Sequence, residues 1–144
     1  MRIIDGGITA AKGFLAAGAH IGIKKIKKDL SLLYSEKPAV AAGMFTQNIV
    51  RAAPVVRNEQ IIKNEKKVRA IVTISGNANA CTGEQGLLDN QKMADVYAQM
   101  LQVSSEEVLT AATGIIGKQM PINIIEQGIQ KITPQLKRDR QSAK

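Results

Sequence analysis

The sequence predicts one layered domain of the α/β or α+β class, and three observations support this prediction. Short apolar runs of strand length alternate along the chain with longer segments whose apolar residues recur at helical spacing. The 144 residues suffice for a single domain with a buried core, which we assign to residues 1–144. Hydrophobic residues make up 44% of the chain and aromatic residues only 3%, so the core is expected to be aliphatic.

The first half of the chain is expected to be mainly extended. Residues 5–22 are rich in glycine and are predicted to form strands joined by tight turns. Residues 30–34 and 39–45 are two apolar runs of strand length. Residues 50–56 either begin a helix or pass their proline as an extended segment. Residues 59–65 are polar with paired isoleucines and are predicted to be helical.

The middle of the chain carries the clearest secondary-structure signals. Residues 68–74 are rich in β-branched side chains and are bounded by turn residues, which predicts a buried strand. Residues 75–86 contain Gly, Asn and Thr and are predicted to form a loop. Residues 87–103 have apolar side chains at helical spacing, so a helix is expected there.

The last third repeats this order of elements. Residues 104–107 are predicted to form a turn or a short helix cap. Residues 108–111 form a strand that opens into a Thr-Gly pair, and residues 122–136 are predicted to form the final helix. Residues 137–144 are polar, and we expect this end to be frayed.

Composition excludes several classes of protein. No run of about 18 uncharged apolar residues occurs, and the first residues lack the layout of a signal peptide. The single cysteine, Cys81, excludes an intrachain disulfide framework and fits a reducing compartment. There is one histidine, His20, and no spacing that gathers four metal ligands. We therefore expect a cytoplasmic protein with no membrane partner, no metal and no bound cofactor.

The net charge of +8 allows three interpretations of the basic surface. The lysines cluster most densely in residues 24–28, where four of them flank one isoleucine. Such a surface can be a solvated face, can steer small anionic metabolites, or can bind nucleic acid by counterion release. Base-stacking aromatic residues are almost absent and no DNA-recognition motif occurs, so no nucleic-acid partner is expected. A solvated face is favoured over the steering of metabolites.

Two glycine-anchored loops, each after a predicted strand, remain as candidates for chemistry. Residues 75–83 combine small residues with two asparagines that tolerate left-handed turn geometry. Residues 110–117 end a strand in Thr113-Gly114, which can present a hydroxyl and a backbone N–H side by side. Two such donors converging on one point stabilise the oxyanion of an acyl-transfer reaction. Taken alone, residues 75–83 are favoured to be an elaborate turn, and the local pattern of residues 110–117 does not favour an oxyanion site. A phosphate-binding loop is excluded, because Ala112 and Gln119 break its pattern.

Read together, these loops and several other blocks resemble the ornithine acetyltransferases, also called bifunctional glutamate N-acetyltransferases of arginine biosynthesis. The strongest match is Ser-Gly-Asn-Ala-Asn-Ala-Cys-Thr-Gly at residues 75–83, and the blocks occur in the family's order over nearly the whole chain. The other blocks are residues 8–14, 16–18, 22–25, 28–30, 38–39, 41–46, 48, 52–55 and 113–117, with Pro121 and Ile129.

The resemblance implies a fold, a reaction and partners. It implies an αββα-type layered sandwich with a mixed sheet, of which this chain is the N-terminal α-chain part, completed by a β chain of the same precursor. The αβ unit is expected to assemble into a heterotetramer. Members of the family cut their own chain before a threonine, which then carries acetyl from N-acetylornithine to glutamate. Some members also accept acetyl-CoA as donor. On this resemblance Thr113 (hydroxyl) and Gly114 (N–H) stabilise the oxyanion.

The chain departs from the family's pattern mainly at its end. Single departures occur at Ile74, Gln47 and Ile49, and none of them touches a named catalytic role. The nucleophilic threonine, the scissile bond and most substrate ligands are expected beyond Lys144. The chain alone is therefore expected to be inactive and to need its missing half for stability. Two other hypotheses stay open: a non-catalytic remnant or regulatory binding protein of the same fold, and a small basic nucleic-acid binder.

Overall fold

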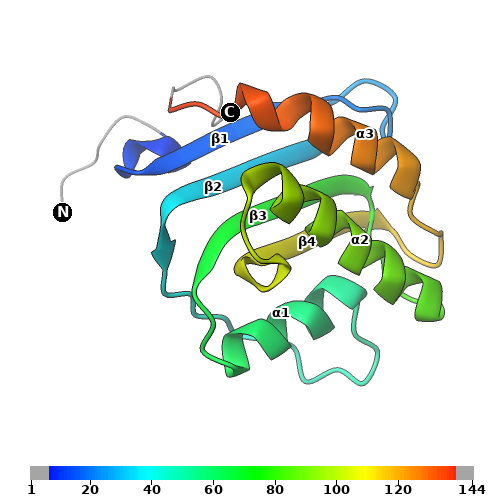
Figure 1. Cartoon of the computed structure of the whole chain (residues 1–144). Helices are drawn as coiled ribbons and strands as arrows, with labels where there is room; N and C mark the ends of the chain where they lie inside the picture. The colour runs from blue at the N-terminus through cyan, green and yellow to red at the C-terminus, as the bar shows by residue number, and fades with distance from the viewer. Residues whose placement is uncertain (1–6, 139–144) are drawn as a thin grey trace.

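The computed structural model describes residues 7–138, which form a four-stranded sheet and three α-helices (Figure 1). The strands are β1 (Phe14–Ala19), β2 (Leu30–Ala39), β3 (Val68–Asn77) and β4 (Val108–Ile115). The helices are α1 (Ala53–Lys63), α2 (Gly83–Leu101) and α3 (Ile122–Ile132). Three short 3₁₀ turns complete the described chain: η1 (Ile8–Ala10), η2 (Ser105–Glu107) and η3 (Thr133–Gln135).

The sheet is mixed, as the family resemblance implies. Its strand order is β1-β2-β3-β4, with β1 and β3 antiparallel to β2 and with β4 parallel to β3. Parallel neighbours need a crossover connection, and α2 supplies it between β3 and β4. As a consequence, the loops that follow β3 and β4 emerge at the same end of the sheet.

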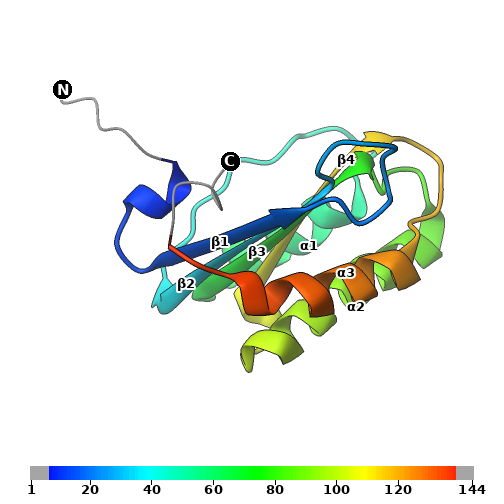
Figure 2. The ribbon, with the colours of Figure 1, turned by 90° about the horizontal axis from the view of Figure 1, so that it is seen from above.

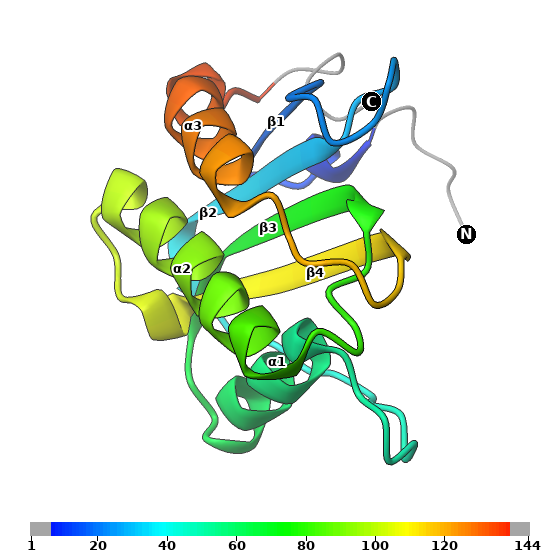
Figure 3. The same cartoon turned by 90° about the vertical axis from the view of Figure 1, so that its right-hand side faces the viewer.

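One face of the sheet is buried under helices. In β3 every second residue from Val68 to Ile74 is buried, while the residues between them are only half-buried. α2 and α3 cover the buried face, and α1 packs beside the β4 edge (Figures 2 and 3). The core beneath the helices is mostly aliphatic, as expected from the composition, with Tyr97 fully buried and donating its hydroxyl hydrogen to the Leu33 carbonyl at 3.1 Å.

The opposite face of the sheet is open. Among the helices and 3₁₀ turns described in residues 7–138, only η1 lies on this face, near the β1 edge (Figure 2). The irregular segment after β2 borders the face at its other end, where Val40 and Ala41 line a pocket with Leu33, Ile71 and Leu109. The strand register places one apolar row across this face: Ala16, Leu33, Ile71 and Leu109. Towards the carboxyl ends of β3 and β4 the row gives way to hydroxyl side chains. The described residues thus supply one helical layer and one sheet layer of the expected sandwich.

Two sequence-based predictions about strands are wrong. Residues 39–45 were expected to form a strand, but β2 ends at Ala39 and residues 40–48 have no regular structure. The physical reason is the lack of a partner, because Ala39 already pairs with Val68, the first residue of β3. Within 5–22 there is one strand and one 3₁₀ turn rather than several strands. Residues 5 and 6 lie outside the described residues.

Several predicted boundaries also shift. The alternative at residues 50–56 is resolved as helical, since α1 begins at Ala53 with Pro54 in its first turn, where no N–H is needed. β3 runs on to Asn77 and α2 starts at Gly83, so the loop between them is shorter than predicted. In the end expected to be frayed, Lys137 exchanges two backbone hydrogen bonds with Ala16. Residues 139–144 lie outside the described residues.

Candidate functional site

The two glycine-rich loops lie side by side at the carboxyl ends of β3 and β4 (Figure 3). In the last part of the parallel pairing, Ser75 is opposite Thr113 and Gly76 is opposite Gly114. Two backbone hydrogen bonds join the loops beyond this point: Ala78 N–H to the Ile115 carbonyl at 2.9 Å and Gly117 N–H to the Ala80 carbonyl at 2.8 Å. The structure therefore brings together the two segments in which sequence reasoning placed the chemistry.

Gly114 stands where no other residue fits. Its φ is +139°, and a Cβ added to it would lie 2.3 Å from the carbonyl carbon of Gly76 and 2.5 Å from the nitrogen of Asn77. Both obstacles are backbone atoms of the neighbouring strand, so a side chain cannot displace them without shifting β3. The glycine thus allows β4 to approach β3 at the end of the pairing.

The N–H of Gly114 faces the outer edge of the sheet. β4 is the last strand, and the side-chain amide of Asn58 binds both backbone groups of Thr110 at this edge, with N–H to Oδ1 at 3.1 Å and Nδ2 to the carbonyl at 2.8 Å. Backbone groups of a strand alternate in direction, and from this alternation we infer that the N–H of Gly114 faces the same edge as that of Thr110. The pairing of Thr113 and Ile115 with β3 agrees with this alternation. Sequence reasoning did not single out Asn58.

The hydroxyl of Thr113 lies on the open face. By the same alternation its side chain shares that face with Ser75, its neighbour across the strands, and with Thr73. Thr113 and Gly114 are both exposed, and within residues 7–138 the Thr113 hydroxyl forms no hydrogen bond. The two donors therefore occupy the corner where the open face meets the β4 edge. Their convergence on one oxygen atom stays a prediction.

A buried asparagine network holds the loops at this corner. The Asn77 amide donates to the carbonyls of residues 118–119, at 2.9 and 3.2 Å, and its oxygen accepts the Asn79 N–H at 2.8 Å. The Asn79 amide donates to the Gly86 carbonyl, and its oxygen accepts the Thr82 hydroxyl hydrogen, both at 2.8 Å. Asn77 and Asn79 are at most 2% exposed. Asn77 therefore ties the end of β3 to the segment that follows β4, and Asn79 fixes the start of α2 beside it.

The loop of residues 20–28 is fixed against the same end of the sheet. Asp29, 2% exposed, accepts the N–H of Ile21 at 2.6 Å and of Lys24 at 2.8 Å through its carboxylate, and its carbonyl accepts the Ser75 N–H at 2.9 Å. Burial raises the pKa of Asp29, but the N–H groups of the loop outweigh burial and leave this pKa below its ordinary value. Sequence analysis assigned Asp29 no role of its own.

Replacing Asp29 by asparagine is expected to destabilise the chain by about 2–4 kcal/mol at neutral pH, because loop N–H groups lose a buried charged acceptor. The pKa of Asp29 is lower in the folded than in the unfolded chain, so its contribution is full above about pH 4. It is lost as the pH falls through the folded-state pKa. Urea unfolding followed by circular dichroism, near pH 7 and near pH 3, measures both effects.

The matched control is Glu36→Gln, which neutralises an exposed carboxylate that forms no ion pair within residues 7–138. It is expected to change the free energy of unfolding by less than about 0.5 kcal/mol. Equal effects of the two substitutions would contradict the role assigned to the Asp29 carboxylate.

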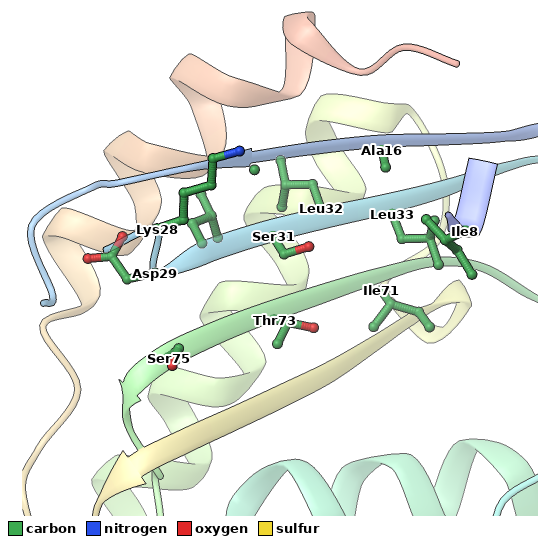
Figure 4. A pocket seen from close by; sticks show the side chains of 12 residues that line it. Ile8, Ala16, Lys28, Asp29, Ser31, Leu32, Leu33, Ile71, Thr73 and Ser75 are labelled. Carbon is green, nitrogen blue, oxygen red and sulfur yellow. The ribbon is translucent and has the colours of Figure 1, made fainter. Parts of the chain in front are cut away.

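The open face also holds a pocket of about 380 Å³ (Figure 4). Ile8, Leu33 and Ile71 line one end of it, and Asp29 and Ser75 lie at the other. In the described part of the chain no three His, Cys, Asp or Glu side chains gather as metal ligands. Nor does any described helix have the length and apolarity that crossing a membrane requires.

Comparison with known proteins identifies the class and then the family. The fold is that of an incomplete α/β protein of the arginine-biosynthesis acetyltransferases, and residues 15–144 match the model of the ArgJ family. The chain belongs to the ArgJ family. The resemblance seen in the sequence is thereby confirmed.

The similar proteins are much longer than this chain. The arginine biosynthesis bifunctional protein ArgJ of Thermotoga neapolitana is 46% identical over 129 residues, 89% of this chain and 32% of that protein. The glutamate N-acetyltransferase of Methanocaldococcus jannaschii is 47% identical over 132 residues, 92% of this chain and 32% of that protein. The chain thus spans about a third of the length of the curated relatives it matches.

Two solved structures share the fold with a TM-score of 0.93 each. The arginine biosynthesis bifunctional protein ArgJ of Bacillus halodurans is 36% identical, and the match covers 99% of this chain and 74% of that one. The ornithine acetyltransferase of Mycobacterium tuberculosis, solved with ornithine, is 35% identical, with 99% and 77% covered. The α/β fold with a mixed sheet, which the family resemblance implies, is therefore confirmed.

Proposed function

We propose that this chain supplies the oxyanion-stabilising part of an acetyltransferase that moves an acetyl group from N-acetylornithine to glutamate. The observation that carries the proposal is the exposed corner of β4, where the Thr113 hydroxyl is without a partner in residues 7–138. Strand alternation from Thr110 directs the N–H of Gly114 to the free edge beside it. Family membership and the names of the relatives supply the reaction class.

The chemistry assigned to the corner is electrostatic. When a nucleophile adds to the acetyl carbonyl, the carbonyl oxygen takes the electron pair of the C=O π bond and becomes an oxyanion. A hydroxyl and an N–H already in place hydrogen-bond to that oxyanion more strongly than to the neutral carbonyl, which lowers the barrier. The same contacts serve the second step, in which the amine of glutamate attacks the acetyl-enzyme. The nucleophile is a threonine outside this chain.

The open face of the sheet is the proposed contact with the rest of the enzyme. A β chain of the same precursor covers the apolar row of Leu33, Ile71 and Leu109, all half-buried in this chain. Burial of this row stabilises an αβ heterodimer, two of which form a heterotetramer in the cytoplasm. Glutamate and N-acetylornithine are the small-molecule partners, and acetyl-CoA is an alternative donor rather than a bound cofactor.

Co-expression tests the proposal. We would produce residues 1–144 together with the part of the Thermotoga neapolitana relative that follows its matched region, purify the complex and assay acetyl transfer from N-acetylornithine to glutamate. The expected result is a stable complex with activity, and no activity from either part alone. The control pairs the same remainder with the relative's own matched region.

Two outcomes would contradict the proposal. A stable complex without activity would favour a non-catalytic remnant or regulatory protein of the same fold. The absence of a complex under conditions in which the relative's own two parts assemble would show that the open face does not receive this partner.

A further inference from the structure

The loop of residues 20–28, here called the lysine loop, carries the densest positive charge of the sequence, and the proposed function leaves it unused. Lys24, Lys25, Lys27 and Lys28 all belong to it. Within residues 7–138 none of the four ammonium groups forms an ion pair. Lys24 is half-buried and the other three are exposed. The loop therefore offers uncompensated positive charge.

A lysine-rich loop that serves only solubility needs no fixed backbone, but the lysine loop is fixed. The buried Asp29 carboxylate binds two of its N–H groups, at 2.6 and 2.8 Å, and one of these belongs to Lys24. His20 lies at the start of the loop, with its Nδ1 3.1 Å from the Lys27 carbonyl and 3.3 Å from Asp29 Oδ2. Asp29 is the only acidic residue in these contacts, and its oxygens are engaged with the backbone. The lysine side chains are left unneutralised.

The lysine loop lies at the same end of the sheet as the Thr-Gly corner (Figures 1 and 2). Its side chains cover Gly76, because a Cβ added to Gly76 would lie 2.7 Å from Ile23 Cγ2 and 3.2 Å from Lys24 Cγ. Gly76 is the strand partner of Gly114, and neighbouring strands are about 4.8 Å apart. The aliphatic part of the Lys24 side chain thus packs on Gly76, which is the strand neighbour of the proposed oxyanion donor Gly114.

From this placement we propose that the lysine loop binds the anionic group of the substrate whose carbonyl is held at Thr113–Gly114, with the Lys24 ammonium as the contact. The inference rests on the proposed function. The ligand chemistry is an anionic oxygen group, which in acyl transfer is either the carboxylate of an N-acetylated amino acid or a phosphate of a larger acetyl donor. A half-buried ammonium on a pinned loop binds such a group with little loss of conformational freedom.

The test uses the active complex described above and the variant Lys24→Met. Methionine keeps an unbranched stem over Gly76 and removes only the charge. Lys25→Met is the matched control, because Lys25 is the adjacent lysine and is exposed. Lys24→Arg restores a positive charge at the same position and is expected to recover most of the lost preference for anionic substrates.

The readout is the preference for an anionic over a neutral substrate, which a general loss of stability would not change. One arm compares kcat/KM for N-acetylornithine with that for its carboxamide, and the other compares acetyl-CoA with acetyl-pantetheine, which lacks the phosphates. Where an analogue is not turned over, its inhibition constant is used. Lys24→Met is expected to lower kcat/KM for the anionic member of one pair by about 10- to 100-fold. The neutral member is expected to change by less than about threefold.

The arm in which the preference collapses identifies the anionic group as carboxylate or phosphate. An unchanged preference for the anionic substrate in both arms would overturn the proposal. Equal losses of this preference in Lys24→Met and Lys25→Met would overturn it too, because they would indicate general electrostatic attraction by the loop instead of a contact with Lys24. An inactive unmodified complex would refute the proposed function. An active complex with unchanged preferences would refute the Lys24 contact alone.

Discussion

Replacing Thr113 by alanine is expected to lower kcat of the active complex by about 100- to 1,000-fold, the typical effect of removing one oxyanion donor. The hydroxyl acts in the transition state, so KM is expected to change little. Thr113 is exposed and its hydroxyl has no hydrogen bond within residues 7–138, so the free energy of unfolding is expected to stay within about 0.5 kcal/mol of the original. Steady-state kinetics and urea unfolding measure these quantities.

Two further substitutions at this position serve as controls. Thr113→Ser keeps the hydroxyl and is expected to retain most of the activity, while Thr113→Val keeps the shape, loses the donor and is expected to behave like Thr113→Ala. If the valine variant keeps a kcat close to that of the threonine enzyme, the hydroxyl is not an oxyanion donor and the proposed site must lie elsewhere.

Replacing Gly114 by alanine is expected to abolish measurable activity and to lower the free energy of unfolding by about 2–4 kcal/mol. The added Cβ would lie 2.3 Å from the Gly76 carbonyl carbon and 2.5 Å from the Asn77 nitrogen, at a φ of +139°. Because the end of β4 must then move away from β3, the N–H of residue 114 and the hydroxyl of Thr113 would both be displaced. Urea unfolding and the acetyl-transfer assay measure the two effects.

Gly117 provides the matched control for this steric argument. It also has a positive φ, +75°, but no atom lies within 4 Å of an added Cβ. Gly117→Ala is therefore expected to show only the backbone penalty of about 1 kcal/mol and to leave the complex active. If both alanine variants were destabilised equally, the contact with β3 would not be what reserves position 114 for glycine.

Local patterns in the sequence predicted the elements that make up the core. The β-branched run at 68–74 is a central strand, and the helical spacing at 87–103 belongs to a helix that covers it. The apolar run at 39–45 failed because an apolar composition cannot show whether a partner strand is present. Boundaries near residues 77–83 failed because they depend on side-chain hydrogen bonds: Asn77 reaches the carbonyls of residues 118–119, far away in sequence, and Asn79 binds Thr82 and Gly86 at the start of α2.

The candidate site was predictable in its residues but not in its geometry. Thr113 and Gly114 were singled out from a strand end and a resemblance, and the structure places them at an exposed corner of β4. The pairing of Gly114 with Gly76 depends on the register of two strands whose residues are distant in sequence. The contribution of Asp29 was hidden for a different reason: its partners, Ile21 and Lys24, are near in sequence, but they meet its carboxylate only when the loop folds back.

The contact of Asn58 with Thr110 has a consequence for how the molecule avoids self-association. An unprotected edge strand offers its backbone to any other extended chain, which can lead to polymeric sheets. Here the Asn58 amide imitates the backbone of an additional strand, with one donor and one acceptor on Thr110. A strand of another molecule therefore cannot pair with β4 over its full length. The backbone of β4 stays accessible only at its carboxyl end, beyond Thr110. This stretch can bind a small molecule but is too short to pair with a long extended chain.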